Sequence, residues 1–235
     1  MTLEELKQLE LEDPPKVGVT SFKILCYVPN QIDYLRYVLV FQGMKCAFVE
    51  DKWAHFMFFY YVAIAMDVID GAFARVLDQT SRFGQCLDMI CDRASVSMMY
   101  IVLGQVYPKL EYLMIACFII DYGAHFLQFM SNAIIKNTSH KCMTGSEGWL
   151  VKLYYTNKFF FVLMACGADN GLVYAFLYGR HSELKKSVGF NIAMVFFACI
   201  IIVKQIINVG QWVGSVEKLV QHDLDQKIKL SESKR

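Results

Sequence analysis

Apolar residues along the chain gather into six long blocks separated by shorter polar stretches. The blocks cover residues 30–44 with their flanks, 53–75, 84–107, 110–135, 155–178 and 187–213. A helix needs about 20 residues to cross the ~30 Å hydrocarbon core of a bilayer. The pattern therefore predicts an all-α polytopic membrane protein with six transmembrane helices, the first and third gaps being short enough for helical hairpins.

The blocks form one predicted membrane domain, residues 25–215, between an N-terminal segment (1–24) and a C-terminal tail (216–235). The N-terminal segment is acidic and lacks the apolar core of a cleavable signal. Thr2 and Glu5 have capping-box spacing, which favours a short helix on the membrane surface. We expect the polar tail to be an amphipathic or disordered cytosolic end.

Lys and Arg predict the orientation. With six spans, both termini, the turn at 76–83 and the loop at 136–152 share one side, which carries 13 of the 23 basic residues, whereas the other side carries six. The richer side is expected to be cytosolic. The glycosylation sequon at Asn137 would then lie in the cytosol.

The amino-acid composition agrees with a membrane protein and adds little to this prediction. Hydrophobic residues make up 56% of the chain, the mean hydropathy is +0.35, and a net charge of +1 gives no indication of a nucleic-acid partner. The eight cysteines contain no C-x2-C pair, and no His spacing supports zinc at Cys86 and Cys91. We expect these two to be small buried core residues.

Four carboxylates lie inside the second and third blocks, in the run D-x-x-D-G-x-x-A-R-x8-G-x3-D-x3-D. Asp67 and Asp70 share one helix face, and Asp88 and Asp92 share another. A helical hairpin brings all four to similar depth, roughly 12 Å below its turn. Charges inside a membrane are costly and indicate function. Clustered carboxylates suit Mg²⁺ or Mn²⁺; the alternative is acidic residues that are merely salt-bridged between helices.

The run resembles the signature of the CDP-alcohol phosphatidyltransferases at every position. Further short segments, within roughly residues 26–180, resemble the eukaryotic phosphatidylinositol synthase branch of that family: Val28-Pro29-Asn30, Arg82-Phe83-Gly84, Leu87-Asp88-Met89, Asp121 with His125, and Tyr154-Tyr155-Thr156.

This resemblance implies the family's fold and the transfer of a phosphatidyl group from CDP-diacylglycerol to myo-inositol, with release of CMP. It implies Mg²⁺ or Mn²⁺ as cofactor, held by Asp67, Asp70 and Asp88. Asp92 is implied as general base and as a further metal ligand. It also implies an endoplasmic reticulum membrane enzyme whose active site faces the cytosol, with a homodimer as a common state.

Other residues are candidates for substrate contact. We expect Gly71 to let the CDP-diacylglycerol nucleotide approach the backbone and Arg75 to bind phosphate, and the resemblance adds Ser81 at the turn. Asp121 and His125, one turn apart, are a possible acceptor pocket, with a helix-to-helix hydrogen bond as the alternative. Four further residues are left open between substrate contact and structural pairing: Asn30, Arg36, Lys158 and Lys204.

Competing functions remain. The same chemistry could use glycerol 3-phosphate, choline or ethanolamine; an anionic acceptor would need additional basic residues near Asp92. A membrane prenyltransferase usually has two separate carboxylate motifs. A cation transporter would explain intramembrane aspartates but not Arg75 and Ser81 at the mouth of the site.

Overall fold

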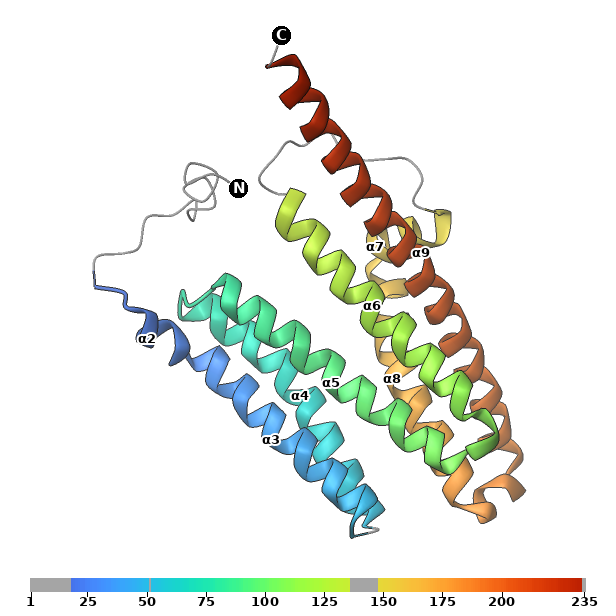
Figure 1. Ribbon diagram of the computed structural model, residues 1–235. Coiled ribbons are helices and arrows are strands. Elements are labelled where there is room, and N and C mark those ends of the chain that lie inside the picture. The colour runs from blue at the N-terminus through green and yellow to red at the C-terminus, as the bar shows by residue number, and fades with distance from the viewer. Residues whose placement is uncertain (1–17, 51, 136–147, 234–235) are drawn as a thin grey trace.

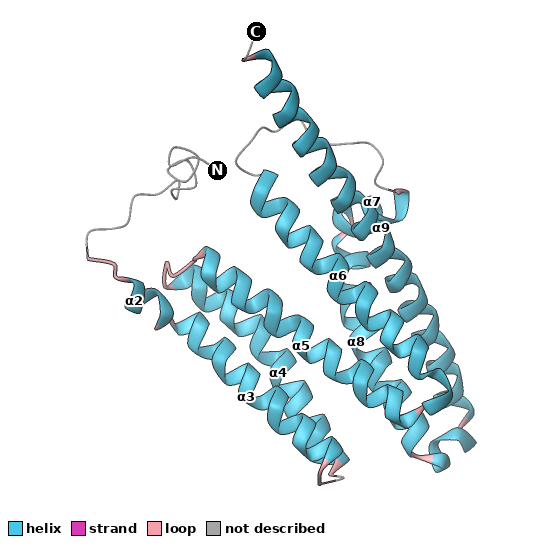
Figure 2. Ribbon diagram, in the orientation of Figure 1, coloured by secondary structure: helices cyan, strands magenta, loops and turns pink. Residues whose placement is uncertain are grey.

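The structure, a computed structural model, describes residues 18–50, 52–135 and 148–233, and within them every regular element is a helix (Figure 2). The elements are α2 (Ser21–Leu25), α3 (Val28–Phe48), α4 (Trp53–Val76), α5 (Arg82–Val106), η1 (Pro108–Leu110), α6 (Glu111–Ile135), α7 (Trp149–Thr156), α8 (Lys158–Arg180), η2 (Ser182–Lys186) and α9 (Val188–Glu232).

The long helices run alternately up and down, so that the α4–α5 turn, the end of α6 and the start of α8 lie at the same end of the bundle (Figure 1). Helix α5 packs against α3, α4, α6 and α8, and α9 packs against α6 and α8. Because α5 is central, residues on its different faces meet both the α3–α4 hairpin and the α6–α9 group.

Four helical segments are long and apolar enough to cross a bilayer: Trp53–Val76, Pro108–Ile135, Lys158–Arg180 and Val188–Glu232. The chain is therefore a multi-pass membrane protein, and the prediction of six spans is confirmed only in part. Helices α3 and α5 have 21 and 25 residues, which is sufficient length, but both carry several charges. The hydropathy of these two helices is lowered by the residues that build the site.

Helix α9 has 45 residues and continues to Glu232 without interruption at the expected tail boundary. At 1.5 Å per residue it is about 68 Å long, more than twice the thickness of the hydrocarbon core. Its polar second half therefore extends beyond the bilayer as a helix. The expected N-terminal surface helix and the Asn137 sequon lie outside the described residues.

The turn between α4 and α5 is closed by local contacts. Asp78 has φ 52°, in the left-handed region that Asp tolerates better than most residues. Ser81 is the N-cap of α5 and accepts a hydrogen bond from Gly84 N at 2.9 Å. Gln79 Oε1 accepts a hydrogen bond from Val28 N at 2.8 Å. This contact joins the turn to the start of α3 and brings the carboxylate-bearing helices against Arg36.

Candidate metal and substrate site

Five carboxylates from three helices surround the guanidinium group of Arg36. Its Nη1 donates to Asp33 at 2.9 Å, Asp70 at 2.8 Å and Asp88 at 3.0 Å. Its Nη2 donates to Asp67 at 2.8 Å and Asp92 at 2.5 Å. The four signature aspartates thus converge as the hairpin geometry predicts.

Helix packing explains this convergence. The two carboxylates of α4 and the two of α5 each repeat at helical spacing, so each pair faces the neighbouring helix. Arg36 projects from α3, which packs against both. Arg36 is 1% exposed, and its planar guanidinium group can donate hydrogen bonds to several carboxylates at once. One guanidinium compensates one of the five negative charges, which leaves a strongly anionic centre.

The carboxylates fit a divalent metal. Two groups, Asp33/Asp70/Asp88 and Asp67/Asp88/Asp92, each offer oxygens that lie within 4.8 Å of one another. An all-oxygen donor set suits Mg²⁺, Mn²⁺ or Ca²⁺ and does not distinguish them. Asp88 belongs to both groups, so it would be a ligand common to both if each group bound an ion. The prediction of an acidic metal site is therefore supported, whereas the identity of the ion is not determined.

One open cavity of about 200 Å³, here called the turn pocket, lies between the α4–α5 turn and the cluster. Its lining includes Gly71, Arg75 and Ser81, the three residues expected to bind CDP-diacylglycerol. Arg75 is exposed at the last turn of α4, and its guanidinium folds over Gly71, where Nη1 would lie 3.5 Å from an added Cβ. The structure therefore brings these three residues together beside Asp70 and Asp88.

Gly84 has a packing role that the sequence analysis did not assign. A Cβ there would lie 2.8 Å from Asn30 Oδ1 and 3.1 Å from Ser81 Oγ. Glycine therefore allows the start of α5 to approach α3 closely. Ser81 has a structural part as N-cap, while its hydroxyl still lines the turn pocket.

A second cavity, here called the deep pocket, lies on the other side of the cluster. Its lining includes Asp67, Asp92, Arg93, Asp169 and Tyr60. Tyr60 is fully buried, and its hydroxyl has no hydrogen-bond partner among the described residues. A buried hydroxyl without a partner is costly, so a water molecule or a polar ligand would be expected to pair with it. Asp92 thus faces both a metal group and this pocket.

Asp121 and His125 are not among the residues that line the deep pocket. Asp121 accepts hydrogen bonds from Arg93 Nη1 at 2.8 Å and from Asn208 Nδ2 at 2.9 Å. The Nδ1 atom of His125 donates to the Asp121 carbonyl oxygen at 2.8 Å. The structure therefore gives Asp121 partners on α5 and α9, and its link to the pocket runs through Arg93.

The two lysines left open by the sequence occupy different places. Lys204 is buried, donates to Asn208 Oδ1 at 2.8 Å and lies 4.9 Å from the centre of the Tyr154 ring. Lys158 is exposed at the start of α8. Neither lines the turn pocket or the deep pocket.

Several site residues were missed by the sequence analysis: Asp33, Tyr60, Arg93 and Asp169. Asp33, Arg93 and Asp169 could have been noticed, because each is a charge within a predicted span or its flank. Tyr60 gave no signal, since tyrosine is common in apolar helices and only the packed bundle shows that its hydroxyl is unpartnered.

Four bilayer-length helices and a partly buried cluster of carboxylates define an integral-membrane protein with a candidate metal site between its helices. The family described as CDP-alcohol phosphatidyltransferase matches residues 26–221. The chain belongs to this family, as its aspartate run predicts.

Curated relatives extend over nearly the whole chain. It is 27% identical to the probable CDP-diacylglycerol–inositol 3-phosphatidyltransferase 2 of Arabidopsis thaliana, over 89% of this chain and 96% of the relative. It is 30% identical to the CDP-diacylglycerol–inositol 3-phosphatidyltransferases of Rattus norvegicus and Homo sapiens, in each case over 88% of this chain and 97% of the relative. No solved structure matches the chain.

Proposed function

We propose that this protein transfers the phosphatidyl group of CDP-diacylglycerol to myo-inositol, giving phosphatidylinositol and CMP. The observation that carries the proposal is the place of Asp92, which belongs to a candidate metal group and also lines the deep pocket. The family membership supports the donor, and the names of the relatives support the acceptor.

The turn pocket is the donor side of this proposal. Arg75 is placed to donate to phosphate oxygens, and Gly71 leaves its backbone open to the nucleotide. Mg²⁺ or Mn²⁺ bound by Asp67, Asp70, Asp88 and Asp92 would neutralise the pyrophosphate and stabilise CMP as it leaves. The apolar diacyl chains would extend along the lipid-facing helices.

Asp92 is proposed to accept the proton of the acceptor hydroxyl. A bond then forms between that oxygen and the phosphatidyl phosphorus, and the phosphorus–oxygen bond to CMP breaks. One Asp92 oxygen contacts Arg36, and the other lies 4.0 Å from Arg93 Nη2. These contacts orient the carboxylate between the two pockets.

The deep pocket is the proposed acceptor side. Tyr60 and Arg93 supply hydrogen-bond donors, and Asp169 supplies acceptors, which together suit a neutral polyol. Asp121 and His125, the possible acceptor pocket of the sequence, do not line this pocket, and Asp121 makes the helix-to-helix hydrogen bonds of the alternative. Its proposed role is to position Arg93. Two basic side chains, Arg36 and Arg93, line this pocket, and both are ion-paired, Arg36 with Asp67 and Asp92 and Arg93 with Asp121. Neither is therefore free to bind an anionic acceptor.

We further propose that α3 and α5 also cross the membrane, giving six spans and the domain limits expected above. Their internal ion pairs offset the cost of their charges. The excess of basic residues at the end that carries the turn pocket supports a cytosolic active site, and the eukaryotic relatives support the endoplasmic reticulum.

The purified protein in detergent tests this function directly. It should convert CDP-diacylglycerol and labelled myo-inositol to phosphatidylinositol in the presence of Mg²⁺ or Mn²⁺, with stoichiometric CMP. Parallel reactions with glycerol 3-phosphate, choline and ethanolamine test the other acceptors. Product with one of these and none with inositol would overturn the acceptor, and absence of CMP with every alcohol would overturn the chemistry.

A further inference from the structure

Asp33 is a buried carboxylate outside the aspartate run of α4 and α5. It lies one turn before Arg36 on α3, and its side chain is 2% exposed. A buried charge is costly unless opposite charge or a metal compensates it. Its ion-pair partner among the described residues is Arg36, which four other carboxylates share. Arg36 alone therefore cannot balance Asp33.

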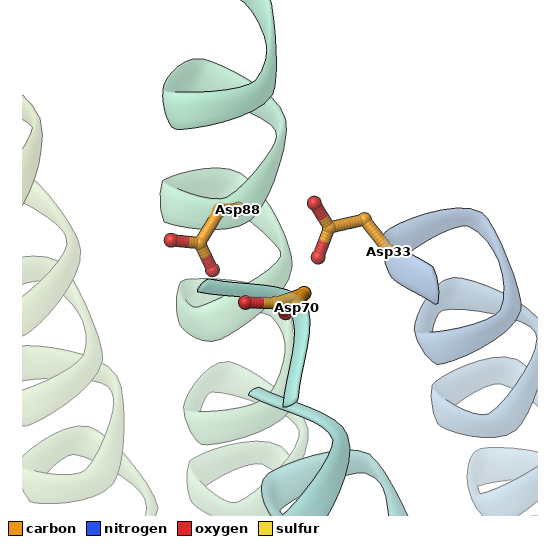
Figure 3. Close-up of side chains that lie close together, drawn as sticks. All are labelled: Asp33, Asp70 and Asp88. Carbon is orange, nitrogen blue, oxygen red and sulfur yellow. The ribbon is translucent and has the colours of Figure 1, made fainter. Parts of the chain in front are cut away.

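Asp33 converges with two signature aspartates on one point. Oxygens of Asp33, Asp70 and Asp88 lie within 4.8 Å of one another, and Figure 3 shows the three carboxylates gathered between α3, α4 and α5. All three accept a hydrogen bond from the same atom, Arg36 Nη1. Three carboxylates directed at one positive charge are arranged as oxygen ligands of a cation are.

A second observation at this place concerns Asn30, one turn before Asp33. Asn30 is 0% exposed, and its Nδ2 donates to the Ile24 carbonyl oxygen at 2.7 Å. Its Oδ1 has no hydrogen-bond partner in the described part of the chain, and Asn30 lines the turn pocket together with Asp33, Asp70 and Asp88. An unpaired buried carboxamide oxygen indicates a missing ligand, such as a cation or its bound water.

We propose that Asp33 is a fifth acidic residue of the metal centre and that, with Asp70 and Asp88, it holds one divalent cation on the turn-pocket side. The proposal rests on the proposed function, which assigns Asp70 and Asp88 to the metal centre. One guanidinium and two divalent cations would neutralise the five carboxylates. Arg36 Nη1 occupies the point on which the three carboxylates converge, so the cation would displace it from them on binding.

Metal binding without substrate tests this. Protein stripped with a chelator is titrated with Mn²⁺, and free Mn²⁺ is read by electron paramagnetic resonance. The wild type should bind two ions per chain. Asp33→Asn should lower the affinity for one of them at least about tenfold, since the loss of a residue that merely contacts a metal ligand already costs that much. Glu183→Gln removes an exposed carboxylate paired with Lys186 and should bind as the wild type does. A binding curve unchanged in Asp33→Asn would overturn the proposal.

The same titration separates a ligand from a residue that only orients Arg36. In the second case Asp33→Asn would slow transfer and leave Mn²⁺ binding unchanged, which would contradict the proposal. If the variant does not fold, anomalous scattering from Mn²⁺ in the wild type decides. An ion at bonding distance from the Asp33 carboxylate supports the proposal, and ions bound only by other carboxylates overturn it. A wild type that binds Mn²⁺ through Asp33 but makes no phosphatidylinositol would contradict the proposed function alone.

Discussion

At the scale of single residues, the proposed chemistry depends on Arg36 and its five carboxylates. Removing one carboxylate opens a ligand set, and removing Arg36 leaves five carboxylates without their shared positive charge. Removing one partner of a buried ion pair costs more stability than the pair itself contributes, because the other charge is left unpaired. Substitutions at this cluster are therefore expected to affect activity far more than substitutions elsewhere in the bundle.

Replacing any one of Asp67, Asp70 and Asp88 by Ala should abolish nearly all transfer. An incomplete oxygen shell would leave the charge of the pyrophosphate uncompensated. Initial rates in a Mg²⁺ or Mn²⁺ titration measure this, with Glu183→Gln as the control of unchanged activity. Chelation of divalent ions should abolish activity in the wild type, and added metal should restore it. Full activity in a chelated sample would refute metal dependence.

Asp92→Asn should abolish turnover while CMP still binds. The amide keeps the size of the side chain but cannot accept the proton of the acceptor hydroxyl. Turnover and calorimetric CMP binding, measured on the same preparation, separate these effects. A near-normal rate would show that Asp92 is not the base, and loss of CMP binding would show instead that its main role is metal ligation.

Tyr60→Phe should raise the KM for inositol by roughly threefold to tenfold, which corresponds to one hydrogen bond, and leave the KM for CDP-diacylglycerol unchanged. The hydroxyl has no protein partner among the described residues, so thermal stability should not fall. Tyr61→Phe is the matched control, because Tyr61 donates to Asn170 instead. An unchanged inositol KM in Tyr60→Phe would argue against the deep pocket as the acceptor site.

At the scale of helices, the position of the site residues depends on close packing between neighbouring helices. Helix α6 meets α9 at Gly123, where an added Cβ would lie 2.3 Å from the Trp212 ring. The same pair of helices carries the hydrogen bond between Asp121 and Asn208. The position of Asp121 behind Arg93 therefore depends on a glycine two residues further along α6.

Gly123→Ala should destabilise the protein by about 1–3 kcal/mol, the usual cost of overpacking. The melting temperature in detergent should fall measurably. Gly189→Ala is the control, because the nearest atom to its added Cβ is 4.0 Å away and the site lies in the first turn of α9. Equal melting temperatures for the two variants would mean that Trp212 moves aside at little cost.

At the scale of the whole molecule, the alternating helices place the α4–α5 turn and the polar end of α9 on one side (Figure 1). The turn pocket opens at that side. In the proposed orientation, the loops rich in Lys and Arg and the turn pocket, which would bind the nucleotide of CDP-diacylglycerol, therefore lie on the same side of the membrane.

Asn137 should be unmodified in cells, because the proposed orientation puts its sequon in the cytosol. Glycosidase treatment followed by mass analysis measures this. As a control, an acceptor sequon with polar spacers inserted after Glu183, in the loop at the opposite end, should be glycosylated. A glycosidase-sensitive mass shift at Asn137 would invert the topology and separate the turn pocket from cytosolic nucleotide.

The sequence alone was sufficient for the all-helical membrane class, the family and the convergence of the four signature aspartates. Long apolar blocks leave few alternatives to membrane helices, and spacing along a hairpin determines which carboxylates share a face and a depth. Periodicity within one helix carries this information, so no knowledge of helix packing was needed.

Only the tertiary structure brought Asp33, Arg36 and Tyr60 to the site. Their roles depend on how α3 and α4 pack around α5, and such contacts between distant segments leave no periodic pattern in the chain. Packing likewise gave Asp121 its partners on α5 and α9. Local spacing determined which residues share a helix face, and interhelical packing decided which of those faces meet.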